Sequence, residues 1–197
     1  MNKLTKQELE SIVNRIECVY QDILARYDGS KYPEDAYEKM ISAFSEKQEA
    51  NHEIENAMMW KWGHWGKDNY PQHHKELITK ISKIWPAFLQ EDCATPCETF
   101  SYWKNQLQKS HRYITVSFIT HLIHPESVPI IDQHNYRAML FLLKVAGRAP
   151  KQKKKPSNWN DIINLGEFLS SLSHHLNKPE REVDKFLMMY GRYCVPR

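Results

Sequence analysis

Apolar residues recur every three or four positions along most of this chain, a spacing that places them on one face of an α-helix. The first such run follows Thr5 and stops at Asp28 and Gly29. Its apolar members are Leu9, Ile12, Val13, Ile16, Val19, Tyr20, Ile23 and Leu24. Thr5 and Glu8 have the spacing of a capping box, which satisfies backbone N–H groups of a first turn. The pattern predicts a helix that begins after Thr5 and ends before Asp28.

The same period recurs further along the chain, after residues that favour a helix start. These helices are expected to begin near Pro33, Pro71, Thr95, Ser157 and Pro179. Pro86 is expected to break or kink the helix that follows Pro71, because proline lacks the N–H that the helix interior requires. Gly191 is expected to end the last helix.

The segment from Ile114 to Ile123 fits two patterns. Its β-branched residues alternate as in a strand, yet its apolar residues also form one wide helical face. No partner strand is evident elsewhere, so we expect a buried helix. The chain is therefore predicted to be all-α, a single globular helical domain of residues 1–197 with two packed lobes. Residues 111–145 would form its central, hairpin-like helix pair.

Composition supports this class of fold. The chain has only six glycines, too few for a turn-rich all-β protein. No apolar run reaches the length of a membrane span, and the first residues lack the apolar core of a signal peptide. With only four cysteines, we expect a cytoplasmic protein with reduced thiols and no membrane partner.

The charge is unevenly distributed along the chain. Residues 1–131 hold 15 Lys or Arg against 18 Asp or Glu, whereas residues 132–197 hold 12 against 6. Six of those twelve cations lie between Lys144 and Lys155. Residues 147–157 therefore read as a basic, exposed connector that could face a polyanion. The alternative is a basic loop that serves solubility alone.

Asp132 is the acidic residue with the most distinctive surroundings. Apolar residues precede it after Pro129, and His134 and Arg137 follow it. Because Pro129 disfavours helix just before itself, Asp132 can cap a helix that begins after it and accept N–H hydrogens from Asn135 or its neighbour. His134 and Arg137 then share one helical face. These residues alone leave two interpretations open: a functional carboxylate, or a helix cap with no further role.

The run from Ile114 to Arg137 resembles the core of the helix-hairpin-helix DNA glycosylase superfamily, the endonuclease III type. In that family a hairpin leads into a buried helix, an apolar segment and a catalytic Asp in a context similar to Pro-x-x-Asp-x-His-x-x-Arg. Pro129, Asp132, His134 and Arg137 fall at these positions, and the match covers roughly two dozen residues. The resemblance implies a divergent member of the superfamily, with Asp132 as the catalytic residue and DNA as the partner.

The chain also departs from the family pattern. The family hairpin usually carries a Gly-x-Gly turn that holds DNA phosphate, but residues 107–112 contain no glycine. Lys109, His111 and Arg112 are expected to contact DNA there instead. The lyase lysine of bifunctional members aligns with Ile114, which cannot form a Schiff base. The iron–sulfur loop of some members has no counterpart, so no cofactor is expected.

The resemblance implies monofunctional base excision. The target base leaves the stack at a cost on the order of a few kcal/mol. Positive charge then builds on the sugar, where Asp132 would stabilise it and activate water. His134 and Arg137 would contact neighbouring phosphates or the carboxylate. The alternative is a non-catalytic nucleic-acid-binding or protein-interaction module with the same fold, in which Asp132 is only a cap.

Three tryptophans lie within residues 60–65. Aromatic rings between cations can stack on bases, so Trp60, Trp62 and Tyr70 are candidates for the wall of a base pocket. The alternative is that these rings fill the core. Gly63 and Gly66 predict a tight turn that another group approaches closely.

A metal site has little support. The ten histidines are scattered, and Cys93 and Cys97 have no second pair of ligands nearby. We expect no metal.

Overall fold

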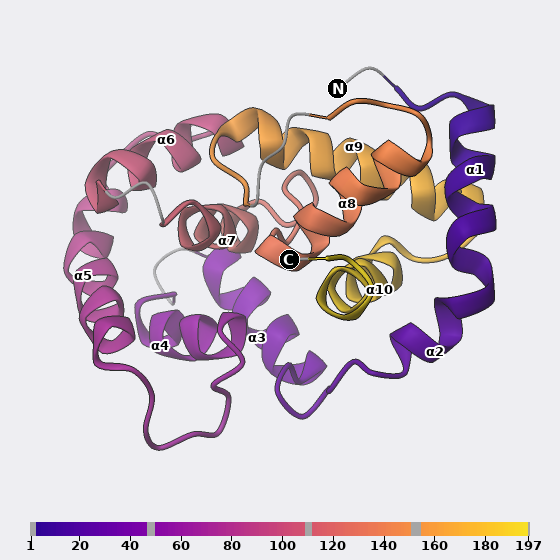
Figure 1. Ribbon diagram of the computed structural model, residues 1–197. Helices are drawn as coiled ribbons and strands as arrows, with labels where there is room; N and C mark the ends of the chain where they lie inside the picture. Colours follow the sequence, from indigo (N-terminus) through magenta and orange to yellow (C-terminus); the bar gives the residue numbers. More distant parts are fainter. Residues whose placement is uncertain (1–2, 47–49, 109–111, 151–154, 197) are drawn as a thin grey trace. The chain divides into compact units, whose positions relative to one another are not determined.

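The computed structural model describes residues 3–46, 50–108, 112–150 and 155–196. Within these ranges every regular element is a helix, and the all-α prediction is confirmed (Figure 1). None of the helices formed by these residues is both long and apolar enough to cross a membrane.

The chain forms two compact units. Unit 1 contains residues 1–27 and 129–197, and unit 2 contains residues 28–128. The chain thus begins in unit 1, builds the whole of unit 2, and returns to unit 1 just before Asp132. The two members of the predicted hairpin-like helix pair fall in different units.

Unit 1 combines the N-terminal helices with the C-terminal ones. They are α1 (Lys6–Ile16), the short 3-10 helix η1 (Glu17–Val19), α2 (Tyr20–Leu24), α8 (Gln133–Val145), α9 (Trp159–Leu176) and α10 (Glu180–Tyr193). Helix α10 packs against α8, α2 and α9, and α1 packs against α8 and α9. The single helix predicted after Thr5 is thus interrupted by η1. Its apolar positions still face the core, where Ile12 and Ile16 are fully buried.

Local capping explains where several helices begin. The predicted capping box of α1 is confirmed, with Glu8 Oε2 2.7 Å from the Thr5 amide and Thr5 Oγ1 3.3 Å from the Glu8 amide. Helix α9 begins after Asn158 and not after Ser157. The Asn158 Oδ1 accepts from the Asp161 amide, and Asp161 in turn accepts from the Ser157 amide and hydroxyl.

Gly191 does not end the last helix, which continues to Tyr193. Its role is to let α10 approach α8. A Cβ atom at this position would lie only 1.9 Å from the backbone oxygen of His134. The prediction of a helix end at Gly191 was wrong, because this glycine is required by contact with the backbone of α8 and not by a turn at the end of α10.

Unit 2 is built from a continuous stretch of chain. Its helices are α3 (Glu34–Ser45), α4 (Ala50–Lys61), α5 (Gln72–Phe88), α6 (Pro96–Leu107) and α7 (Tyr113–Ile123). Helix α7 packs against α3 and α6, and α4 packs against α3 and α5. Pro86 lies in the last turn of α5, near the end of the helix as expected. Helix α4 has no counterpart among the helices predicted from the sequence.

Helix α7 resolves the ambiguous segment in favour of a helix. Every residue from Thr115 to Ile123 is buried, so apolar side chains occur on all of its faces and imitate the alternation of a strand. At its end, buried His121 donates a hydrogen bond from Nδ1 to the Val128 carbonyl at 2.6 Å. Its Nε2, which must then accept in the neutral ring, lies 2.7 Å from the Tyr37 hydroxyl. His121 therefore fixes the last residues of unit 2.

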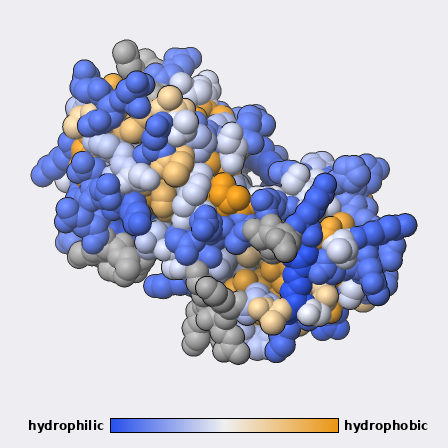
Figure 2. Space-filling model, turned by 90° about the horizontal axis from the view of Figure 1, so that it is seen from above, coloured by the Kyte–Doolittle hydropathy of each residue, from blue (hydrophilic) through white to orange (hydrophobic). Residues whose placement is uncertain are grey.

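On the face that Figure 2 presents, hydrophilic residues cover most of the described surface, and hydrophobic residues occur in small areas between them. Among the described residues, the large hydrophobic side chains classed as exposed are Val145 and Tyr193. All four cysteines are free thiols, and Cys93 is the buried one.

Replacing Gly191 with alanine is predicted to destabilise unit 1 strongly. The new methyl group meets backbone and not a movable side chain, so α10 must shift away from α8. We expect a loss of about 3 kcal/mol in the free energy of unfolding, at the upper end of the range for overpacking. Urea denaturation of Gly191→Ala against wild type measures it.

Gly166 in α9 provides the matched control. It is also a helical glycine of unit 1, but a Cβ there would meet Pro129 at an ordinary 3.5 Å. Gly166→Ala should be neutral or stabilise by up to about 1 kcal/mol, since alanine favours helix over glycine. Equal stability of the two variants would contradict the close approach at Gly191.

Candidate active site at the start of helix α8

Asp132 is the N-cap of α8, as one of the two interpretations required. Its Oδ1 accepts from the His134 amide at 2.5 Å and from the Asn135 amide at 2.9 Å. Among the described residues, the cap uses Oδ1 alone, and Asp132 is half-buried, not sealed from solvent. The second oxygen, Oδ2, thus keeps its lone pairs for a water or a ligand. A cap and a functional carboxylate are compatible in this geometry.

The side chain of Asn135 completes the capping box by a hydrogen bond to the backbone of Asp132. Its Oδ1 accepts from the Asp132 amide at 2.9 Å, which makes the capping box reciprocal. Its Nδ2 donates to the Ile130 carbonyl at 2.7 Å and to Asp184 Oδ1, on α10, at 2.8 Å. Asn135 is almost fully buried, with 1% of its surface exposed. The capping pattern predicts Asn135 only as a backbone N–H donor, and no local pattern in the sequence indicates Asp184.

Arg137 and His134 lie next to the same contact between α8 and α10. The half-buried Arg137 donates from Nη2 to the Gly191 carbonyl, and this nitrogen lies 3.4 Å from His134 Nδ1. The Arg137 Nε is buried without a partner among the described residues. The structure therefore gives Arg137 a role inside unit 1. Its predicted contact with DNA stays a prediction, as does that of His134.

The predicted DNA-binding turn belongs to unit 2. Lys109 and His111 lie outside the described residues. Arg112 precedes the first residue of α7, and its Nη1 lies 3.4 Å from the Leu107 carbonyl. Gln108, which ends α6, has a positive φ of 49°, a conformation that glycine adopts more easily. Gln108 thus takes a left-handed conformation at the end of α6 although it is not a glycine. The contact of this turn with DNA is untested.

The basic connector of residues 147–157 contacts the rest of unit 1 through Arg148. The guanidinium of Arg148 makes two bonds to Glu8, with Nε 2.6 Å from Oε1 and Nη2 2.8 Å from Oε2. This partner lowers the pKa of Glu8 to about 2. Residues 151–154 lie outside the described part of the chain. Arg148 therefore ties the start of the connector to α1, while Gly147, Ala149 and Lys155 are exposed.

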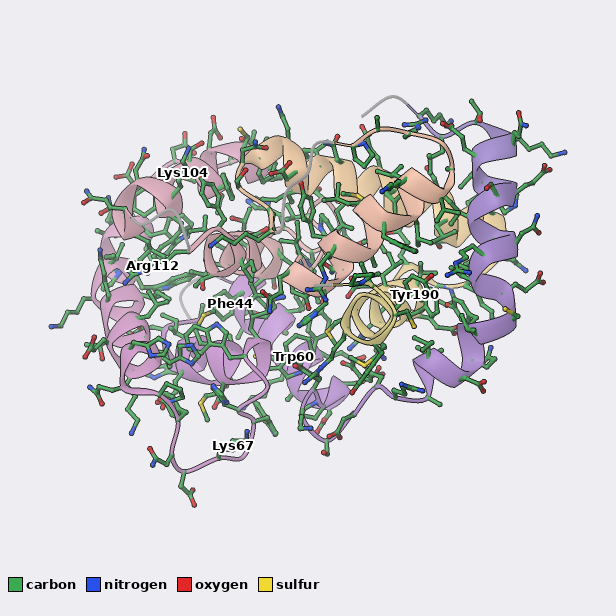
Figure 3. All side chains as sticks on the ribbon, viewed as in Figure 1. Phe44, Trp60, Lys67, Lys104, Arg112 and Tyr190 are labelled. Atoms are coloured by element: carbon green, nitrogen blue, oxygen red, sulfur yellow. The ribbon has the colours of Figure 1, made fainter. Side chains whose placement is uncertain are left out.

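Trp60 lies in the core of unit 2. It is 6% exposed, and its ring stacks on Phe118 at 5.8 Å between ring centres, with Tyr37 at 5.3 Å. Its Nε1 donates to the Pro33 carbonyl at 3.0 Å. Figure 3 shows Trp60 on the helical part of unit 2 and Lys67 on the loop that follows α4. The packing alternative therefore describes Trp60 better than the base pocket does.

Trp62 and Tyr70 belong to a cluster of rings at the turn between α4 and α5. Trp62 stacks on His74 with ring centres 3.9 Å apart, and His64 Nε2 lies 3.2 Å from His74 Nδ1. Tyr70 donates from its hydroxyl to Glu55 at 2.6 Å, and its ring lies 6.1 Å from that of His64. The role of Trp62 and Tyr70 in binding a base stays a prediction.

The predicted turn between these helices is confirmed. Gly63 and Gly66 both have positive φ, of 66° and 68°. A Cβ atom on Gly63 would lie 2.9 Å from the Tyr32 hydroxyl, so another group does approach closely. The two glycines thereby place Trp62 and His64 beside α5.

The histidines of this turn are held in their neutral forms. Burial, with smaller contributions from the neighbouring His73 and His64, lowers the pKa of His74 to about 4. Burial also lowers the pKa of His64, with a smaller contribution from Lys67. A neutral pair can share one hydrogen bond between its rings, whereas two imidazolium rings would repel each other.

No group of three or more His, Cys, Asp or Glu side chains that could hold a metal ion occurs in the described ranges. His124 Nε2 lies 2.9 Å from the Thr99 hydroxyl, and His121 is engaged by Tyr37 and Val128.

No match to this chain was found among models of known protein families, curated proteins or solved structures.

The stability of unit 2 is predicted to fall as the pH decreases from about 6.5 to about 4. His74 has its ordinary pKa of 6.5 in the unfolded chain but a pKa of about 4 in the fold. Between these values the unfolded state binds more protons, so acid favours unfolding. Urea midpoints between pH 7 and pH 4 should show a weaker pH dependence for His74→Gln than for wild type. Identical slopes would contradict the burial of a neutral His74.

Proposed function

We propose that this protein is a divergent DNA glycosylase-like enzyme that removes a flipped base by hydrolysis, with Asp132 as the catalytic residue. The observation that supports it most directly is the half-buried aspartate at the start of α8, whose cap uses only one of its two carboxylate oxygens. Its Oδ1 is fixed by two backbone amides, which orients Oδ2 without a loss of side-chain freedom during the reaction. Such a preorganised negative charge is what a positively charged sugar requires.

The proposed reaction begins with a base rotated out of the DNA stack. As the bond between base and sugar weakens, Asp132 stabilises the positive charge on the sugar and accepts a proton from the attacking water. The base leaves with the electron pair of the broken bond and takes up a proton from solvent, the water oxygen binds the sugar, and Asp132 returns its proton to solvent. The products are the free base and an abasic sugar. Strand cleavage through a Schiff base does not follow, because Ile114 occupies the position of the lyase lysine.

A second candidate is a non-catalytic nucleic-acid-binding or protein-interaction module with the same fold. It is favoured by one observation: two polar residues close to Asp132 also have a structural use. Asn135 and Arg137 both connect α8 to α10. In this candidate Asp132 serves α8 alone. DNA as the partner and a cytoplasmic, reducing location belong to the proposal in both cases, with four free thiols as support for the latter.

Base release from a panel of duplexes with damaged bases tests the enzyme proposal. Wild type should release at least one base and leave an abasic site, which alkali then converts to a strand break. Asp132→Asn should reduce the rate by about 10²–10⁴-fold, the usual contribution of a general acid or base. Release at the wild-type rate by the variant, or no release from any duplex by wild type, would reject the proposal.

The choice of asparagine separates catalysis from capping. Asn is as good an N-cap as Asp, so Asp132→Asn should keep the wild-type stability, whereas Asp132→Ala should lose about 1 kcal/mol. If Asp132 is only a cap, activity and stability will follow one another in the two variants. If it is catalytic, Asp132→Asn will be stable and inactive.

A further inference from the structure

Two side chains that take no direct part in the proposed reaction connect the turn of Asp132 to α10. Asn135 lies one turn into α8, and Asp184 projects from α10. Their contact, 2.8 Å from Asn135 Nδ2 to Asp184 Oδ1, connects the first turn of α8 to a second helix of unit 1. The remaining bonds of the Asn135 amide go to the turn that carries Asp132.

The partners of Asn135 allow only one orientation of its amide. The Ile130 carbonyl and the Asp184 carboxylate accept hydrogen bonds, so both must face the NH₂ group. The Asp132 amide donates, so it must face Oδ1. If the side-chain amide of Asn135 were rotated by 180°, its oxygen would face two acceptors and its NH₂ group would face a donor. Because Asn135 is buried, water cannot replace a lost partner, and the orientation is strongly fixed.

We infer that Asn135 and Asp184 form a positioning pair for the Asp132 carboxylate. Asp184 accepts from the side-chain amide of Asn135 and orients it, and the Oδ1 of that amide accepts from the backbone N–H of Asp132. The backbone N–H of Asn135 in turn donates to Asp132 Oδ1. This chain of bonds leaves the carboxylate in one orientation. The catalytic use of that orientation rests on the proposed function, whereas the positioning itself does not.

The experiment compares Asp184→Ala with Asp184→Asn. Asparagine keeps a carbonyl oxygen that can accept from Asn135 Nδ2, and alanine removes it, so asparagine is the conservative rescue. For base release, Asp184→Ala should lower kcat by about tenfold or more, because small misplacements of a reacting group are costly, and should leave KM unchanged. Asp184→Asn should stay near wild type in both constants.

A second measurement is independent of any activity. The exchange of the His134 and Asn135 amide hydrogens with solvent, followed by NMR, reports the two bonds to Asp132 Oδ1. Both amides should exchange faster in Asp184→Ala and at the wild-type rate in Asp184→Asn. Unchanged exchange in Asp184→Ala would overturn the positioning pair.

The outcomes separate the two proposals. Faster exchange together with a lower kcat supports the pair and its use in catalysis. Faster exchange in a protein that releases no base supports the pair and rejects the enzyme. A kcat that stays at the wild-type value in Asp184→Ala of an active enzyme overturns the role of the pair in the reaction.

Discussion

The close approach of α8 and α10 is the constraint on which the rest of the candidate site depends. It is possible because Gly191 leaves room for the backbone of His134, where any Cβ atom would collide with the carbonyl oxygen. At this distance the Gly191 carbonyl can accept from Arg137, and Asp184 can reach Asn135. Backbone contact of this kind cannot relax by rotation of a side chain, so it fixes the two helices more strictly than apolar packing does.

Asp132 gains its geometry from this contact and not from its own helix alone. A cap on an isolated helix would hold Oδ1 but leave the preceding residues free. Here Asn135 also binds the Ile130 carbonyl and is itself bound by α10. The tyrosine of the same helix adds a further connection, because the Tyr136 hydroxyl donates to buried Asp161 on α9 at 2.9 Å. The start of α8 is thus attached to two neighbouring helices, which suits a preorganised carboxylate.

Local signals were sufficient for much of the fold, and distant contacts account for what they missed. Thr5 and Asp132 were predicted as caps because a cap depends on residues within one turn. Helix α4 was not predicted, because four consecutive residues from Ala57 to Trp60 are buried and give no amphipathic period. Asp184 could not be connected to Asn135, since 49 positions separate them and no local pattern joins them. Trp60 shows the same limit, because composition cannot separate a ring in the core from a ring in a pocket.

The proposed function requires that the Asp132 carboxylate faces an incoming sugar and stabilises positive charge there. The most direct test is the affinity for two DNA duplexes that differ only in an abasic-sugar analogue, one with a cationic ring nitrogen and one with the neutral ring oxygen. Wild type should bind the cationic duplex on the order of 10²-fold more tightly, as transition-state analogues are bound, and Asp132→Asn should lose that preference. Equal affinity of the wild-type protein for both duplexes would contradict the account.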